Sequence, residues 1–142
     1  MALPPDIRSI RIPVFSNQTQ EPDIENIVTR SIKDRFIRDG RLSVVDSDTA
    51  DSVLTGIVLR YNLRPLSYDT QNNVTSYLAE LNIAVTHKTA SGQVLSKRKV
   101  DTKEVYKVEQ LVAQSEINRK VALLEAASTS AESILSLVVE AF

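Results

Sequence analysis

The sequence contains no cysteine and only one histidine. Without cysteine the chain has no disulfide framework, no thiolate zinc site and no thiol nucleophile. A single histidine leaves carboxylates and water as the remaining metal ligands, and no spacing typical of a tight first-row metal site stands out. We therefore expect no metal, no cofactor and no catalytic residues, and we expect that the protein is not an enzyme.

A strong charge of one sign and a long hydrophobic run are also missing. Seventeen basic and eighteen acidic residues nearly cancel, so the broad positive field of a nucleic-acid-binding protein is not expected. No apolar run approaches the roughly 20 residues that span a bilayer, and residues 1–5 lack the charged start and apolar stretch of a signal peptide. The composition is ordinary for a globular protein, with 42% hydrophobic and 25% charged residues. We expect a single domain over residues 1–142 with its own core.

The first part of the chain has the pattern of a strand, a helix and a short strand. Apolar residues occupy every second position over 10–14, which predicts a strand with one buried face. From Ile24 the apolar spacing changes to three and four residues, typical of an amphipathic helix. Gly40 is expected to end this helix, since glycine readily adopts the left-handed conformation of a C-terminal cap. A short strand is expected over 42–45.

The middle of the chain predicts three longer strands. The first covers residues 52–63, and Pro65 is expected to interrupt its regular pairing. The second covers 75–87 and alternates apolar with polar side chains, so one of its faces should be covered. The third begins at 93 after a glycine-containing turn, and its many charged residues up to 106 predict an exposed face or a departure from the sheet.

The last segment, residues 114–141, is predicted to form a long amphipathic helix. Its apolar and small residues recur at alternating steps of four and three positions. The stripe consists of Ile117, Val121, Leu124, Ser128, Ala131, Leu135, Val138 and Phe142. Further apolar residues widen it, so this helix should cover a sheet face. The predicted fold is α+β in the order β-α-β-β-β-α, a four-stranded, mostly antiparallel sheet with two helices packed on one face and the other face uncovered.

Several acidic residues and the histidine are candidates for catalytic or metal-binding groups. Asp46, Asp48 and Asp51 lack the glycine and terminal glutamate of a calcium loop, and such segments are typical of turns. His87 has no neighbouring nucleophile or base in the sequence, so we interpret it as a structural residue. A hydrolase using aspartate and serine would need a base and an oxyanion site, and the sequence suggests neither.

Five basic residues form the main candidate binding site. They are Arg60, Arg64, Lys97, Arg98 and Lys99. If their strands are neighbours, these side chains form a site for phosphate or carboxylate groups, in which the arginines make bidentate contacts. The alternative is a solvated edge strand that lysine and arginine protect against aggregation.

A second candidate is a loop that contacts a protein partner. It comprises Arg64, Pro65, Leu66, Ser67, Tyr68 and Asp69. This segment places apolar and aromatic side chains in a turn context, as in many interfaces. The alternative is that Leu66 and Tyr68 pack into the core.

Four short segments in a fixed order carry a resemblance to a known family. They are IRIPVFSNQT at 10–19, DGRL at 39–42, ADSVLTG at 50–56 and RPLSYD at 64–69, followed by a long helix that ends in VVEAF. In this order and spacing they resemble the LptE family of lipopolysaccharide-assembly lipoproteins. The first segment also resembles other envelope domains, of the curli-secretion lipoprotein and TolB N-terminal types. The segment at 64–69 favours the LptE family.

The resemblance implies a fold, a location and partners. Members of the LptE family are outer-membrane lipoproteins on the periplasmic side, in Gram-negative bacteria. They fold as two helices on a four-stranded sheet, plug the LptD β-barrel, help it assemble and bind lipopolysaccharide during its delivery to the cell surface. The lipobox cysteine of the family is missing here, so we expect the N-terminal lipid anchor in the natural precursor and a soluble protein without it. No basic residue here matches a lipopolysaccharide-binding position of the family residue by residue.

Overall fold

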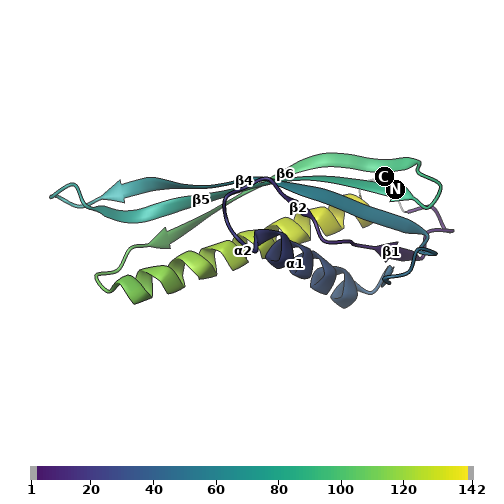
Figure 1. Ribbon diagram of the computed structural model, residues 1–142, viewed down its shortest axis with the longest axis horizontal. Coiled ribbons are helices and arrows are strands. Elements are labelled where there is room, and N and C mark those ends of the chain that lie inside the picture. The colour runs from purple at the N-terminus through teal and green to yellow at the C-terminus, as the bar shows by residue number, and fades with distance from the viewer. Residues whose placement is uncertain (1–2, 141–142) are drawn as a thin grey trace.

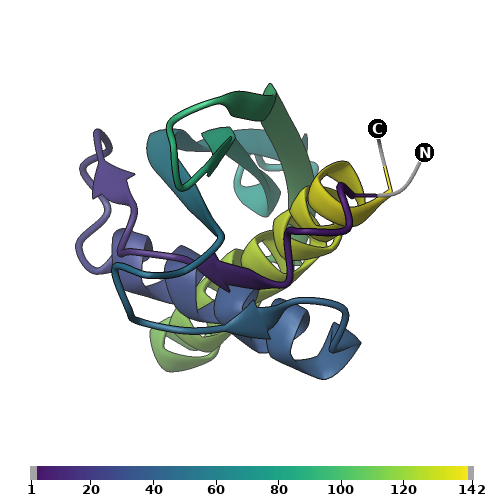
Figure 2. The ribbon, with the colours of Figure 1, turned by 90° about the vertical axis from the view of Figure 1, so that its right-hand side faces the viewer.

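The computed structural model describes residues 3–140 and shows a long, twisted sheet with two helices on one face (Figure 1). The elements are β1 (Ser9–Arg11), β2 (Ser16–Asn17), α1 (Ile24–Asp39), β3 (Ser43–Val44), β4 (Ser52–Tyr68), β5 (Val74–Thr89), β6 (Val94–Lys107) and α2 (Val112–Val139). The α+β class and the placement of both helices are confirmed. The end-on view shows α1 and α2 beside each other (Figure 2).

The strand count differs from the prediction. The strand expected over 10–14 is shorter than predicted, since β1 ends at Arg11 before Pro13, and β2 (Ser16–Asn17) lies beyond it, where no strand was predicted. Pro13 has no backbone N–H, so it cannot donate to the ladder and the strand is interrupted. Two short strands bring the predicted four to six: β2, and β3 over 43–44, which the four-stranded prediction did not count. The order is β3-β1-β4-β5-β6, and β2 also pairs with β4.

The direction of pairing divides the sheet into two parts. The long strands β4, β5 and β6 are antiparallel, as expected. The short strands are parallel: β1 pairs with both β3 and β4, and β2 pairs with β4. The carboxylate of Asp51 fixes β1 in place by accepting hydrogen bonds from the backbone N–H groups of Arg8 and Ser9, at 2.8 and 3.0 Å. These bonds lower the pKa of Asp51.

The core lies between the sheet and the helices. Along β5 the alternation predicted from the sequence is confirmed, since Leu81 and Ile83 are both 0% exposed. They pack in one cluster with residues of α1 such as Ile32 and Phe36. On β4, Gly56 leaves room for the ring of Phe15, and a Cβ atom there would collide with that ring. The glycine inside the predicted strand thus marks a close side-chain approach.

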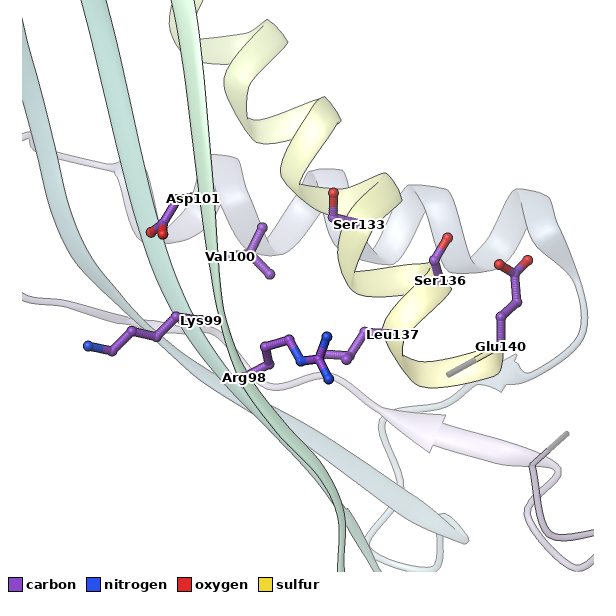
Figure 3. A pocket seen from close by; sticks show the side chains of 8 residues that line it. All are labelled: Arg98, Lys99, Val100, Asp101, Ser133, Ser136, Leu137 and Glu140. Carbon is purple, nitrogen blue, oxygen red and sulfur yellow. The ribbon is translucent and has the colours of Figure 1, made fainter. Parts of the chain in front are cut away.

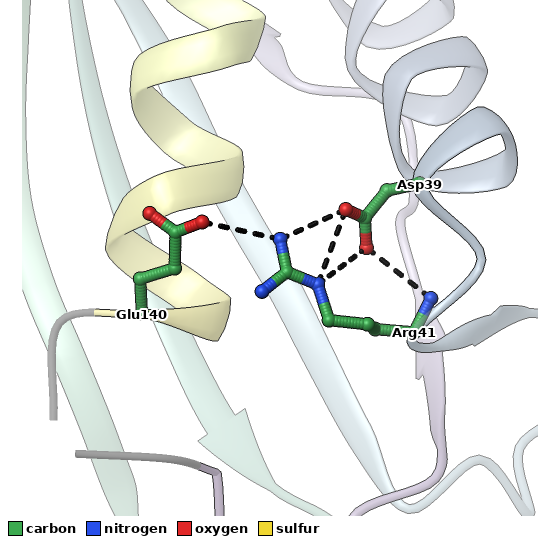
Figure 4. Close-up of polar contacts among 3 residues, drawn as sticks. All are labelled: Asp39, Arg41 and Glu140. Carbon is green, nitrogen blue, oxygen red and sulfur yellow. Dashed lines mark hydrogen bonds and ion pairs between the residues drawn. The ribbon is translucent and has the colours of Figure 1, made fainter.

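Helix α1 follows the prediction, and its end is tied to the end of α2. Gly40 has φ 79° and donates its N–H to the Phe36 carbonyl at 3.1 Å, as expected for a helix C-cap. The guanidinium of Arg41 contacts Asp39 at 2.8 Å and Glu140 at 3.2 Å (Figure 4). These contacts join the loop after α1 to the C-terminal end of α2.

Helix α2 is present, but only its second half matches the predicted stripe. Ala131, Leu135 and Val138 are buried, whereas Ile117 and Leu124 are 54% and 53% exposed. Val121 and Ser128 are also exposed, and Phe142 lies outside the described residues. The prediction is wrong for Ile117, Val121, Leu124 and Ser128, because the buried side of α2 is turned away from them here and carries Leu123. Its small residues Ala122, Ala126 and Ala127 face the fold instead.

By length and composition, α2 also resembles a membrane-spanning helix. However, 56% of its most apolar window is buried within the fold. A core helix of a globular protein shows the same combination of length and burial. We therefore assign the apolar character of α2 to core packing.

A candidate ligand-binding face and a candidate partner segment

Strand register decides which of the predicted basic residues lie together. Directly opposite residues of antiparallel strands have side chains on the same face. Arg60 is opposite Asn82, which is opposite Asp101, and Lys99 is opposite Ala84. These positions alternate with the buried Leu81 and Ile83, so they lie on the face away from the helices. We call this the open face.

The structure brings four of the five predicted basic residues onto the open face. They are Arg60, Arg64, Lys97 and Lys99, which lie on β4 and β6 with β5 between them. Arg98 is the exception, because it is opposite Val85, whose side chain is 2% exposed and points toward the helices. Figure 3 shows Arg98 extending toward Leu137 on α2, while Lys99 points to the other side of β6.

A β-bulge places Arg60 on the open face. Leu54 and Val58, at even positions of β4, face the core. Strict alternation would put Arg60 on that face too, but a register shift between Val58 and Arg60 inserts one residue and reverses the order. The bulge therefore has a direct effect on the charge of the open face.

Lys103 also belongs to the open face, although it was not among the predicted site residues. It lies opposite Glu80 and continues the two-residue spacing of Lys97 and Lys99. That spacing was the signal that would have identified it. Within residues 3–140, Arg64 has an ion-pair partner on this face, its Nη2 lying 2.5 Å from Oε1 of Glu80.

The remaining basic side chains of the open face have no carboxylate partner in this part of the chain. Among the described residues, Arg60, Lys97, Lys99 and Lys103 form no ion pair. Asp101, the acidic residue among them, accepts a hydrogen bond from the Asn82 amide. The open face thus offers several exposed cations to an anionic ligand.

The predicted partner segment is mostly strand rather than loop. Residues Arg64 to Tyr68 belong to β4, with register shifts around Ser67, so the regular pairing is disturbed as expected but the strand continues. The turn itself follows at 69–73, where Asp69 accepts hydrogen bonds from the N–H groups of Gln71 and Asn73 at 2.8 and 2.9 Å. These bonds lower the pKa of Asp69 and give it a structural role.

The apolar residues of this segment are on the surface. Leu66 is 51% exposed and Tyr68 is 58% exposed, so the alternative that they pack into the core is wrong. Leu111, the N-cap residue of α2, and Val112, its first residue, are also strongly exposed. The start of α2 lies at the same end of the molecule as the turn between β4 and β5 (Figure 1). This end therefore presents apolar side chains from two elements that are distant in sequence.

The acidic residues and the histidine named as candidates for catalysis take part in contacts within the fold or are buried in it. His87 is 1% exposed, and burial lowers its pKa to about 4. Asp51 binds the backbone before β1, and Asp46 lies 3.8 Å from Lys33 in an exposed ion pair. Within residues 3–140, no group of three histidine or acidic side chains is arranged to hold a metal ion.

Several solved structures share the fold, and some of them are named as lipoproteins. Rare lipoprotein B from Shewanella oneidensis has a TM-score of 0.64 at 17% identity, covering 89% of this chain and 91% of that one. Lipoprotein B from Nitrosomonas europaea has a TM-score of 0.64 at 12% identity, covering 98% and 90%. The PelC dodecamer from Paraburkholderia phytofirmans has a TM-score of 0.64 at 14% identity, covering 98% and 93%. At these identities the likeness shows the fold alone.

The sequence itself identifies the family. Comparison with curated proteins gave no match. The model of the LptE family, described as lipopolysaccharide-assembly, matches residues 7–138, which is nearly the whole chain. This family comprises non-enzymatic lipoproteins associated with the outer membrane. The chain belongs to the LptE family of lipopolysaccharide-assembly lipoproteins.

Proposed function

We propose that the protein plugs the LptD β-barrel, helps it assemble, and binds lipopolysaccharide on its open face. In this proposal the natural form is held at the periplasmic side of the outer membrane by an N-terminal lipid. The observation that carries the ligand proposal is the group of basic side chains on the sheet face opposite the two helices. Phosphate and carboxylate groups of lipopolysaccharide are suitable partners for such cations.

Two features support the plug role. The lumen of an outer-membrane barrel is polar, and the open face carries polar and charged side chains such as Asn62, Asn82 and Asp101. The exposed apolar side chains of Leu66 and Tyr68 provide contacts of the kind that anchor protein interfaces. We propose that residues 64–69 touch the barrel and the basic residues touch the ligand.

The barrel proposal is tested by co-expression with LptD from the same genome. We expect a one-to-one complex on purification, and we expect the double variant Leu66→Ser/Tyr68→Ser to weaken it. Ile37→Ser is the matched control, because Ile37 is 60% exposed but lies on α1. If a folded barrel and the folded wild-type chain do not associate, the plug proposal is wrong. If both variants weaken the complex equally, the assignment of residues 64–69 is wrong.

The ligand proposal has a control within the same strand. Lys97→Gln/Lys99→Gln removes two charges from the open face, while Arg98→Gln removes a charge from the residue between them on the opposite face (Figure 3). We expect the double variant to bind purified lipopolysaccharide at least about tenfold more weakly and Arg98→Gln to stay within about twofold. Equal losses in both would show that net charge, rather than the open face, determines binding. Unchanged binding by a folded double variant would contradict the proposal.

A further inference from the structure

Strand β6 forms one edge of the sheet, and its outer side carries unpaired backbone groups. It pairs with β5 along its length and, among residues 3–140, with no other strand. The Val108 N–H donates to the Thr75 carbonyl at 3.0 Å, which fixes the phase of the ladder. Because backbone groups alternate in direction along an antiparallel strand, even-numbered residues point toward β5 and odd-numbered residues point outward.

The outward groups are free over a definite stretch. At Lys107 the outward carbonyl already accepts a hydrogen bond from the Asn118 amide of α2, at 2.9 Å. Within residues 3–140, the outward N–H and C=O groups from Lys97 to Val105 have no partner. We call this stretch, residues 97–105, the β6 edge. It is long enough for a short extended peptide to form a regular ladder.

Two hollows run beside the β6 edge, between it and α2. One of about 550 Å³ lies between Arg98 and Val100 on the strand and Ser136 and Leu137 on the helix (Figure 3). The other, of about 370 Å³, is lined by Tyr106, Val121 and other residues. In a strand added to this edge, alternate side chains would point toward these hollows and the others would continue the open face.

Charge distinguishes between two occupants of the edge. The outward residues Lys97, Lys99 and Lys103 place basic side chains on the open face, with Asp101 among them. In a two-fold antiparallel pair of β6 strands centred at residue 99, 100 or 101, at least one pair of lysines is directly opposite. Like charges in that position destabilise a sheet. A second copy of this chain is therefore a poor partner, and a strand with acidic residues fits.

We propose that the β6 edge is a docking site for an extended, acidic segment of another polypeptide, which adds a strand to the sheet. Acidic residues at every second position of that segment lie beside the lysines, and its intervening apolar or small residues face the hollows next to α2. Backbone hydrogen bonds provide affinity, and the lysines favour acidic segments over neutral or basic ones. This proposal does not depend on the barrel or lipopolysaccharide proposals, since its test contains neither the barrel nor lipopolysaccharide.

The test uses a defined probe, the fluorescein-labelled peptide Thr-Glu-Val-Glu-Thr-Glu-Val-Glu-Thr. A second peptide has the same sequence with N-methyl groups at the alternate positions that would donate to β6, so its charge is unchanged. We expect fluorescence anisotropy to show saturable binding of the first peptide and at least about tenfold weaker binding of the N-methylated one. An equal affinity of both peptides would mean electrostatic attraction alone and would overturn the proposal, as would no binding.

A pair of protein variants tests the same β6 edge by changing the protein instead of the peptide. Asp101→Pro and Asp101→Thr both remove the carboxylate, but only proline removes the outward N–H. We expect Asp101→Pro to bind the peptide at least about tenfold more weakly than Asp101→Thr. Equal binding by two folded variants would overturn the proposal.

Hydrogen exchange on the wild-type protein gives a result even if Asp101→Pro does not fold. We expect the peptide to slow exchange at the amides of Lys99, Asp101 and Lys103. Protection elsewhere but not there would overturn the proposal. Sedimentation should show a monomer without peptide, and a dimer whose formation protects the same amides would identify a second copy as the occupant and also overturn it.

Discussion

The same strands form both faces of the sheet, but the side chains on the two faces meet different physical requirements. On β5, Leu81 and Ile83 are completely buried against the helices, while their neighbours Asn82 and Ala84 lie on the open face. The covered face depends on shape and apolar contact. The open face depends on charge, and its residues contribute little packing. If the open face binds the proposed ligand, stability and ligand binding are therefore separable along a single strand, one residue apart.

The largest expected loss of stability comes from removing an aromatic ring that packs against the covered face of the sheet. Phe36 on α1 is 1% exposed and packs in the core, so Phe36→Ala should lower the free energy of unfolding by about 3–5 kcal/mol. The neighbouring Ile37→Ala is the control, since Ile37 is 60% exposed and its loss should cost within about 0.5 kcal/mol. Urea unfolding measures both. Similar losses for the two variants would contradict the packing of α1 described above.

A slightly smaller loss of stability is expected at low pH, where His87 becomes protonated. In the folded protein burial lowers the pKa of His87 to about 4, whereas in the unfolded chain its pKa is about 6.5. Between these values the unfolded state binds more protons, so stability falls as pH drops and is fully present only above about pH 6.5. The loss is about 3 kcal/mol. His87→Leu should remove this part of the pH dependence, while the carboxylates titrate as in the wild type. An identical pH profile of unfolding in both proteins would refute the prediction.

A buried hydroxyl pair should have an intermediate effect. Thr102 on β6 and Ser130 on α2 share a hydrogen bond of 2.7 Å, and Ser130 is 0% exposed. Thr102→Val leaves the Ser130 hydroxyl without a partner and should cost about 1–3 kcal/mol. The double variant Thr102→Val/Ser130→Ala should lose less than the sum of the single changes, because both polar groups are gone. Strict additivity in thermal unfolding would argue against a shared bond.

The smallest effect on stability is expected on the open face. Lys99 is exposed and forms no ion pair among residues 3–140, so Lys99→Gln should change the free energy of unfolding by within about 0.5 kcal/mol. The same change should weaken lipopolysaccharide binding under the proposal above. Chemical unfolding and ligand binding measured on one preparation separate the two effects. A loss of stability comparable to that of Phe36→Ala would remove the distinction between the faces.

The sequence predicted the elements whose signals are local. The three- and four-residue spacing of α1, its end at Gly40 and the alternation along β5 all appear in the structure. Each of these signals depends on residues within a few positions of one another, so tertiary packing was not needed to read them.

The differences arise where distant parts of the chain decide the outcome. The bulge that turns Arg60 to the open face depends on pairing with β5, and propensity gives no signal for it. Ile117 is exposed because α2 packs against the fold through the neighbouring side, which carries Ala122 and Ala126, and the periodicity of α2 alone does not indicate this. Of the five basic residues named from the sequence, the structure therefore places four on the open face and Arg98 on the other, and Lys103 was omitted.

The parallel pairing of β1 with β4 sets the order in which the domain can fold. Strands β4, β5 and β6 are joined by short turns, so their pairing brings together residues close in sequence. Ile10 and Ser52 can pair only after a loop of about forty residues has closed, which carries a larger entropic cost. The hairpins should thus form first and β1 should join late. The segment that would bear the lipid is then also the last part of the sheet to assemble.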